Sequence, residues 1–256
     1  MNSAASRIQV ATESLVHARR TRQPASAASA ELADAASAYA VQDAVAQQMD
    51  WFTDGSPRHW KSGGPSRAAV LTHAALPPEG VWASPADARA WPFRLRGIEA
   101  EIALRLACDV DPARASAIDA DQAGELIDAM CVSIEIVDSR WTEGLDAPAM
   151  AKLADLQSHG GLVLGSWVPF ATRDWSAQEC RVRIGGQPPV ERRGSHAMGD
   201  PLFSLPAWLR HATRSGGSVA QGTVVTTGTW VGILHAAAGD LVTAEFPGIG
   251  SASVQM

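Results

Sequence analysis

The chain has 256 residues, of which 46% are hydrophobic and 19% charged, and its formal net charge is -6. This length and composition can bury one large core or two small ones. The acidic balance, with arginines scattered among acids, argues against the basic stripe of a nucleic-acid-binding protein. We therefore expect a globular protein with no nucleic-acid partner.

The sequence shows neither a membrane-spanning segment nor a cysteine pattern typical of disulfides or zinc. No apolar run approaches the length of a membrane span, and the first twenty residues lack the apolar stretch of a signal peptide. The three cysteines, Cys108, Cys131 and Cys180, form no CxxC pattern, which indicates reduced thiols rather than a zinc site. Together these features predict a cytoplasmic protein with no membrane partner.

The N-terminal part is predicted to be helical. Apolar residues over 41–52 follow the 3-4 spacing of one helix face, residues 4–20 show a weaker version, and TRQPASAAS between them is typical of a linker. Residues 53–95 are rich in Gly, Pro and Trp, which predicts loops with short strands. We expect a helical region over residues 1–60 and a catalytic domain over 61–256.

From residue 96 the period of the apolar residues changes to two. In GIEAEIAL (97–104), Ile98 and Ile102 alternate with Glu99 and Glu101, which is the pattern of a β-strand. Alternate residues of a strand point to opposite faces. The two glutamates are therefore predicted to share one face of a sheet.

The remaining elements follow in chain order. Residues 119–131 combine an Asp cap with an apolar stripe, which predicts a helix leading into a strand, VSIEIVD (132–138). A second helix is predicted over 200–217, with Pro201 in its first turn. Further strands are predicted at residues 161–165, 180–186, 222–228, 241–246 and 251–255. This order predicts an α/β or α+β domain behind the helical N-terminal region.

Three carboxylates are predicted to stand on strands, opposite the apolar side chains of those strands. On a strand, Glu99 and Glu101 lie about 6.5 to 7 Å apart along the backbone and point the same way. Glu135 stands opposite its apolar neighbours in VSIEIVD. Three acids close together would repel one another unless a cation such as Mg²⁺, which prefers oxygen ligands, lies between them. The pattern alone leaves open a solvent-exposed strand face whose acids pair with Arg96 or Arg105.

Eight segments carry a resemblance to a known family. They are AYAVQ (38–42), WKSG (60–63), GIEAEIAL (97–104), SIEIVDSR (133–140), LADLQSHGGLVLG (153–165), GDPLFSLPAWL (199–209), GTVVTTGTWVG (222–232) and AAGDLVTAEFPGIGSASV (237–254). In this order they resemble the fumarylacetoacetate hydrolase superfamily, and within it the branch of 2-keto-4-pentenoate hydratase and 4-oxalocrotonate decarboxylase. The resemblance covers nearly the whole chain from about residue 38.

The resemblance implies a fold and a metal. The fold is α+β and mostly β, a roll or sandwich around Mg²⁺ or Mn²⁺. An E-x-E pair and a later acid hold the metal in the family, and these positions are Glu99, Glu101 and Glu135 in this chain. Lys61 matches the lysine of the family's K-x-G segment, which could hold a substrate carboxylate or donate a proton. Members act on short 2-oxo acids or acylpyruvates, and we expect a homo-oligomer that could associate with another enzyme of its pathway.

The resemblance also implies substrate contacts at Gly63, Ser158 and Thr229. Gly63 would let the backbone approach the ligand, and the Ser158 hydroxyl could bind the substrate carboxylate or orient water. Thr229 falls in the segment that closes over the substrate in the wider superfamily. His159 is a weaker candidate for a general acid or base near the metal. Leu156 stands where the branch commonly has Asn, which puts one polar contact in doubt.

Other catalytic motifs are absent from the sequence. The histidines show no HExxH spacing, the two Ser-His neighbours lie outside any GxSxG motif, and GIGSAS near the end lacks the third glycine of a dinucleotide loop. These absences argue against a zinc protease, a serine hydrolase and a dinucleotide-binding enzyme.

We therefore predict a metal-dependent lyase of aromatic catabolism. It would add water to a short unsaturated 2-oxo acid such as 2-keto-4-pentenoate, through a metal-stabilised enolate. Two alternatives use the same site: decarboxylation of a 2-oxo-diacid of the 4-oxalocrotonate type, and hydrolytic C-C cleavage of an acylpyruvate. A metal-binding homologue without catalysis is a hypothesis of a different class, motivated by Leu156.

Overall fold

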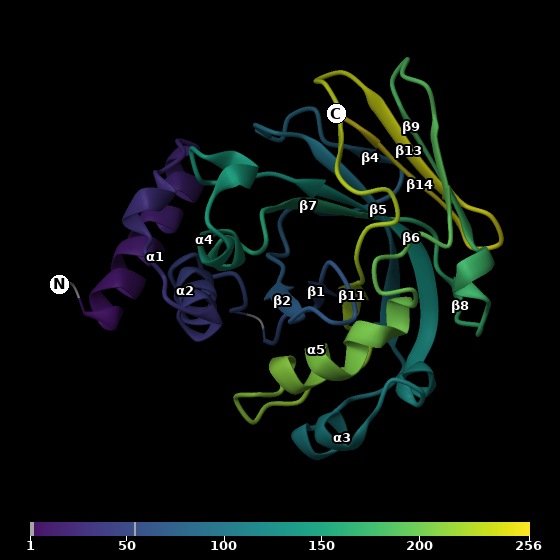
Figure 1. Ribbon diagram of the computed structural model, residues 1–256, viewed down its shortest axis with the longest axis horizontal. Helices are drawn as coiled ribbons and strands as arrows, with labels where there is room; N and C mark the ends of the chain where they lie inside the picture. Colours follow the sequence, from purple (N-terminus) through teal and green to yellow (C-terminus); the bar gives the residue numbers. More distant parts are fainter. Residues whose placement is uncertain (1–2, 54) are drawn as a thin grey trace.

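The computed structural model describes residues 3–53 and 55–256. Two β-sheets pack against each other, and helices flank them (Figure 1). The helices are α1 (Ala4–Thr21), α2 (Ala35–Gln48), α3 (Pro112–Ala117), α4 (Ala149–Ala154) and α5 (Leu205–Ala212). The strands are β1 (His59–Gly63), β2 (Thr72–Ala75), β3 (Val81–Ala83), β4 (Ala86–Asp87), β5 (Gly97–Leu106), β6 (Ile127–Val137), β7 (His159–Leu164), β8 (Val168–Pro169), β9 (Glu179–Ile184), β10 (Val190–Arg193), β11 (Val224–Thr226), β12 (Leu234–His235), β13 (Leu241–Phe246) and β14 (Gly250–Gln255).

The larger sheet has the strand order β2-β1-β11-β5-β6-β7-β3, with β12 beside β5 and β8 beside β6. β5 and β6 are antiparallel and form its long centre, whereas β1 runs parallel to β11. The smaller sheet has the order β10-β9-β13-β14-β4. The predicted α+β, mostly β fold is therefore confirmed, as are the strands predicted after residue 96.

The main core lies between the two sheets. Ile98 and Ile102 of β5 are fully buried and share one apolar cluster with Ile134 of β6, Phe246 of β13 and Val254 of β14. A fully buried side chain of this size stabilises the fold by about 1.5 to 3 kcal/mol. Because strand residues alternate, this packing leaves the odd-numbered residues of β5 on the opposite face of the large sheet.

The N-terminal helices form a second apolar cluster beside the sheets. α1 begins after Ser3, whose hydroxyl accepts a hydrogen bond from the Ser6 amide, and α2 begins after Asp34, which caps it in the same way. Their buried faces pack with α4 and with Trp141, whose indole donates a hydrogen bond to the Ala151 carbonyl. The predicted helices are confirmed, while the domain boundary at residue 60 stays a prediction.

One predicted helix is wrong. Residues 119–131 form only a short 3-10 turn, Ala123–Leu126, and then enter β6 at Ile127. The apolar spacing in this segment fits either element, and pairing with β5 decides it: Asp128 points outward and forms an ion pair with Arg105 across the sheet. Long-range pairing thus overrides the local helical signal.

The predicted helix over 200–217 is shorter than expected. A 3-10 turn, Pro201–Ser204, precedes α5, and Pro206 stands in the first turn of that helix. Two prolines in six residues interrupt the backbone hydrogen-bond ladder and divide the segment. Among the described residues, none of the helices combines the length and the apolar character that a membrane span requires.

Candidate metal centre

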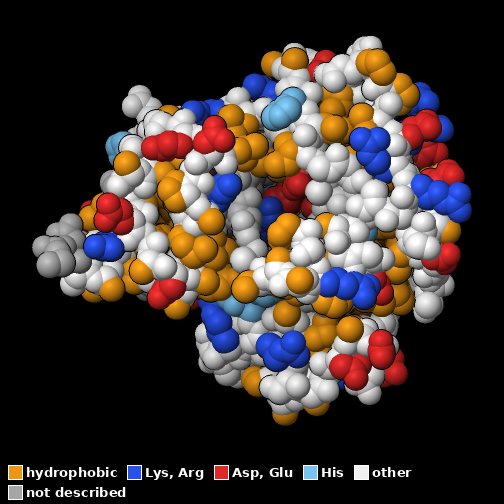
Figure 2. All heavy atoms as spheres, viewed as in Figure 1, with side chains coloured by type: hydrophobic (Ala, Val, Ile, Leu, Met, Phe, Trp, Pro, Cys, Tyr) orange, Lys and Arg blue, Asp and Glu red, His pale blue; other side chains and the backbone are white. Residues whose placement is uncertain are grey.

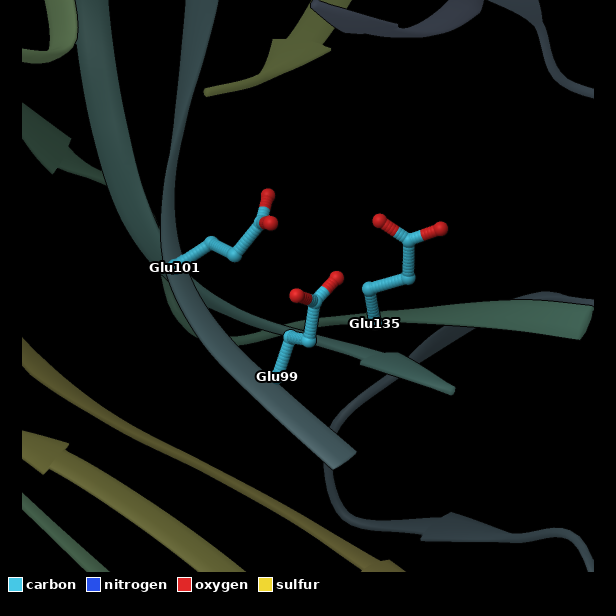
Figure 3. Close-up of side chains that lie close together, drawn as sticks. All are labelled: Glu99, Glu101 and Glu135. Carbon is cyan, nitrogen blue, oxygen red and sulfur yellow. The ribbon is translucent and has the colours of Figure 1, made fainter. Parts of the chain in front are cut away.

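Three glutamates converge on the face of the large sheet opposite the main core. Glu99 and Glu101 project from β5, and Glu135 projects from β6 directly across from Glu99. One carboxylate oxygen from each residue lies within 4.8 Å of the other two. Figure 3 shows the three carboxylates turned toward one another. This arrangement offers three oxygen ligands to one cation, as the alternation of the strands predicts.

The donor set suits a hard divalent cation. Glu101 and Glu135 are 2% and 0% exposed, and Glu135 Oε2 is buried without a hydrogen-bond partner among the described residues. A buried carboxylate oxygen with no donor is costly unless a charge compensates it. Mg²⁺ and Mn²⁺ prefer such oxygen ligands and keep further positions open for water or substrate. The residues therefore fit the metal that the family resemblance implies.

Lys61 brings a positive charge to the three glutamates. Its Nζ lies 2.5 Å from Glu135 Oε1 and 3.3 Å from the carbonyl oxygen of Gln157. Two strands separate β1 from β6 in the large sheet. The contact between Lys61 and Glu135 therefore depends on the curl of this sheet, which brings β1 and β6 close together (Figure 1). Figure 2, drawn from the same side as Figure 1, shows a hollow near the middle of the molecule with acidic and basic side chains inside it.

His159 also reaches the centre. Its Nδ1 lies 3.0 Å from Glu135 Oε1, the oxygen that also contacts Lys61. Burial lowers the pKa of His159 despite the neighbouring carboxylate. A neutral imidazole that donates from Nδ1 would orient Glu135 without adding a charge. The geometry therefore assigns His159 a positioning contact with a ligand residue.

The ionisation of the three acids is linked. Burial, followed by the charges of the other two acids, raises the pKa of Glu99 to about 8. Burial and the charge of Glu135 raise the pKa of Glu101 to about 7. The pKa of Glu135 is lowered, because the Lys61 charge and the His159 contact outweigh its burial. Burial opposes the charge on Lys61, but the three acids outweigh it and raise the pKa of that ammonium.

These shifts predict a pH dependence of metal binding. Because Glu99 is mostly protonated and Glu101 partly protonated at neutral pH, a cation must displace protons, so Mn²⁺ affinity should rise from about pH 6 to about pH 9 and then level off. In the metal-free protein the folded state binds more protons than the unfolded chain over this range, so stability should fall as pH rises. Equilibrium dialysis and denaturant unfolding at several pH values measure both slopes. An affinity independent of pH would contradict the prediction.

Glu101 is held by contacts that sequence reasoning missed. The hydroxyl of Thr226 donates to Glu101 Oε2, and both this hydroxyl and the Gly228 amide act to lower the pKa of the carboxyl, against the effect of burial. Ser133 Oγ lies 2.8 Å from Thr226 Oγ1 and extends the chain of hydroxyls. This network depends on the pairing of β5 with β11 and β6, which places Thr226 opposite Ala103. The sequence of a single strand does not reveal that pairing.

Thr226 therefore tests whether the carboxylate must be held in place. Thr226→Val keeps the shape but removes the donor to Glu101, and we expect Mn²⁺ affinity to fall about 10-fold, at the low end of the 10- to 100-fold typical of partners of metal ligands. Thr226→Ser keeps the hydroxyl and should bind Mn²⁺ within about 2-fold of the unchanged protein. Equal losses in both variants would show that the hydroxyl has no positioning role.

Comparison with known proteins identifies the family. Residues 85–256 match the family model described as fumarylacetoacetate (FAA) hydrolase C-terminal, and this match covers more than half of the chain. The chain belongs to the fumarylacetoacetate hydrolase family. No match was found among curated proteins.

Solved structures extend the likeness to the whole chain. Two structures of 4-oxalocrotonate decarboxylase from Pseudomonas putida G7, complexed with calcium and acetate or with magnesium and adipate, match with TM-scores of 0.81. They are 20% and 19% identical to this chain, and each match covers 100% of this chain and 98% of that one. A 5-carboxymethyl-2-hydroxymuconate delta-isomerase from Mycobacterium smegmatis matches with a TM-score of 0.53 at 18% identity, over 78% of this chain and 76% of that one. At these identities the likeness shows a common fold.

The turn before β7 has an unusual backbone in this family member. Leu156, Gln157 and Ser158 have φ values of 53°, 56° and 58°, the left-handed region that residues with a Cβ rarely adopt. The turn points the Gln157 carbonyl at Lys61 and buries Ser158, whose hydroxyl has no partner among the described residues. Such a hydroxyl is available to a ligand, so the substrate contact of Ser158 stays a prediction supported by its position beside His159.

Leu156 occupies an apolar environment. Its side chain is 2% exposed and packs with Ala74, Leu76 and Leu162. An amide at this position would lose its hydrogen bonds to water without gaining partners in that cluster. Leu156, at the position where the resemblance leads us to expect Asn, therefore adds an apolar side chain to the core.

The two remaining residues with predicted substrate contacts, Gly63 and Thr229, lie in different surroundings. Gly63 lies at the end of β1, where an added Cβ would come 3.8 Å from the Gly228 Cα, so its backbone borders the segment that holds Glu101. Thr229 donates to the Gly232 carbonyl and accepts from the Val231 amide, so its hydroxyl is used within its own turn. Gly63 is brought toward the centre, whereas the hydrogen bonds of the Thr229 hydroxyl are local. Both assignments stay predictions.

Proposed function

We propose that this protein is a divalent-metal-dependent lyase that acts on a short 2-oxo acid. The observation that supports the proposal most is the largely buried ammonium of Lys61, which contacts Glu135 where three carboxylates converge. Perturbed titratable groups that face a hollow are typical of catalytic sites. A structural ion pair would not require two further acids at the same point.

The residues of the centre divide the chemical work. A cation held by Glu99, Glu101 and Glu135 would stabilise the negative charge that develops on the keto oxygen of the substrate. Lys61 carries a proton at neutral pH, so it can hold the substrate carboxylate or protonate the carbon chain next to the keto group. His159 keeps Glu135 oriented, and the Ser158 hydroxyl can bind a carboxylate oxygen or a water molecule.

Two reactions follow from the same centre. Hydration adds water to a conjugated double bond and gives a 4-hydroxy-2-oxo acid. Decarboxylation of a 2-oxo-diacid is the second candidate, and the whole-chain likeness to 4-oxalocrotonate decarboxylase, which includes the N-terminal helices, favours it. Hydrolytic C-C cleavage ranks third, because it needs a water-activating pair at the distal carbonyl and His159 is already committed to Glu135.

The experiment supplies each substrate in turn with Mg²⁺, with Mn²⁺ and with a chelator. Ultraviolet loss of 2-hydroxypenta-2,4-dienoate reports hydration, and carbon dioxide release from 2-oxohex-3-enedioate reports decarboxylation. We expect turnover of at least one substrate that the chelator removes and added metal restores. Absence of metal-dependent turnover with both substrates would overturn the proposal.

A further inference from the structure

A cavity separate from the three glutamates lies on the far side of His159. It has a volume of about 260 Å³, a little below the roughly 300 to 1,000 Å³ of typical small-molecule pockets, so it suits a small ligand. His159 lines it and also contacts Glu135, and none of the three glutamates is among its lining residues. Because the buried imidazole ring stands between the two places, a ligand in this cavity is a different molecule from one bound at the glutamates.

Positive groups outnumber negative groups around the cavity. Four guanidinium groups and two carboxylates line it; they belong to Arg19, Arg22, Arg94, Arg140, Glu79 and Asp138. A third carboxylate, that of Asp155, lies behind the wall and pairs with two of the arginines. These groups together leave one positive charge in excess, which matches an anion of single charge.

Arg19 and Arg140 share the Asp155 carboxylate. Asp155 Oδ1 lies 3.1 Å from Arg19 Nη2 and 2.7 Å from Arg140 Nε, and Asp155 is fully buried. The two arginine side chains are only 13% and 12% exposed. Two largely buried cations beside one buried anion favour a further anion, because the surroundings screen their charges weakly.

Both arginines keep donors that a ligand can use. In each of them Nη1 makes no hydrogen bond with the described residues, and neither Nη1 is sealed from solvent. Burial, followed by the charge of Arg140, lowers the pKa of Arg19 to about 9, so this group stays cationic at neutral pH while it is poorly compensated. A planar guanidinium with free N-H groups matches the geometry of a carboxylate.

The remaining walls add exposed cations and aromatic rings. The Arg22 guanidinium makes no hydrogen bond or ion pair with the described residues, and Arg94 uses only Nη1, for two backbone carbonyls. Trp51 and Trp91 line the sides, and the Arg19 guanidinium lies 4.9 Å from the ring centroid of Trp51. A carboxylate attached to a flat apolar group fits these surroundings better than a fully hydrated ion does.

We propose that this cavity is a second ligand site, which takes a small monocarboxylate with a flat apolar body and is occupied independently of the metal centre. The inference goes beyond the proposed function and does not rest on it. A single carboxylate balances the one excess positive charge, and the tryptophans cover the apolar body. A phosphate group would bring a further negative charge and would leave the aromatic walls without an apolar partner.

The test titrates the full chain calorimetrically with benzoate, benzamide and inorganic phosphate, with and without Mg²⁺. Benzoate should bind roughly 10- to 100-fold more tightly than benzamide, which has the same ring and no charge, because that is the range expected for a charged hydrogen-bonded pair. Benzoate should also bind more tightly than phosphate. Its affinity should agree within about 3-fold in the presence and absence of Mg²⁺ and in Glu101→Gln.

Arginine variants locate the binding in this cavity. Arg22→Gln removes an exposed cation without breaking a hydrogen bond to the described residues, so it should fold normally, bind benzoate several-fold more weakly and keep its Mn²⁺ affinity. Arg19→Gln should weaken benzoate further, because it removes a cation that is largely buried in the wall. Arg20→Gln, in the same turn of α1 but outside the cavity, should leave benzoate binding unchanged.

The contrary outcomes are equally definite. Equal affinities for benzoate and benzamide, phosphate binding as tight as benzoate binding, or benzoate binding that requires Mg²⁺ would overturn the inference. Unchanged benzoate affinity in Arg22→Gln would overturn it as well, and this arm remains decisive if Arg19→Gln fails to fold because Asp155 loses a partner. The measurement involves neither turnover nor a 2-oxo acid, so its result is independent of whether the proposed function holds.

Discussion

Replacing Glu101 with glutamine is expected to weaken Mn²⁺ binding by more than about 100-fold, beyond the effect typical of losing a ligand's hydrogen-bond partner. The same substitution should stabilise the metal-free protein. The folded-state pKa of Glu101 is raised to about 7, so above that pH the folded protein carries a buried charge that the unfolded chain tolerates better. Glutamine keeps an oxygen acceptor for Thr226 and removes this charge.

Two measurements separate these effects. Equilibrium dialysis gives the Mn²⁺ affinity, and denaturant unfolding at about pH 8 gives the free energy of unfolding with and without metal. Glu245→Gln removes an exposed acid of the smaller sheet and should leave both quantities unchanged. Unchanged Mn²⁺ binding in Glu101→Gln would show that the three glutamates are not the metal site.

Replacing Lys61 with methionine should remove most of the activity while leaving the metal site in place. A positioned proton donor contributes about 100- to 10,000-fold to the rate, so we expect a loss of kcat in that range. Methionine keeps the length and apolar stem of lysine. Without the ammonium the pKa of Glu135 should rise, so Mn²⁺ binding in the variant should become more dependent on pH.

The chain provides a matched control, because Lys152 is its other lysine. Lys152 lies on α4 and donates to the Leu145 carbonyl, and none of its hydrogen bonds involves the three glutamates. Lys152→Met should keep full activity on whichever 2-oxo acid is converted. If Lys61→Met retained kcat within about 3-fold, Lys61 would be a structural partner of Glu135 rather than the proton donor.

The convergence of the three glutamates was predictable because its signal is local. Alternation in GIEAEIAL places Glu99 and Glu101 on one face, and a single strand pairing brings Glu135 opposite Glu99. Periodicity gives the face of a strand but not its neighbour in a sheet. The resemblance to a family supplied that pairing and the role of Lys61, which composition and spacing alone left open.

The contacts around the ligands were not predictable in the same way. Thr226 reaches Glu101 only because β11 lies between β1 and β5, an order that no local pattern encodes. The mistaken helix over 119–131 has the same origin, since pairing with β5 chose the strand.

The left-handed turn at Leu156, Gln157 and Ser158 links the centre to local motion. Three such residues in a row are costly, and the turn is held by the Ser158 amide, which donates to the Asp155 carbonyl, and by Lys61, which donates to the Gln157 carbonyl. Loss of the Lys61 ammonium should let the turn open more often, seen as faster amide hydrogen exchange at Ser158 and His159. The lysine proposed as the proton donor would thus also control how often this turn opens.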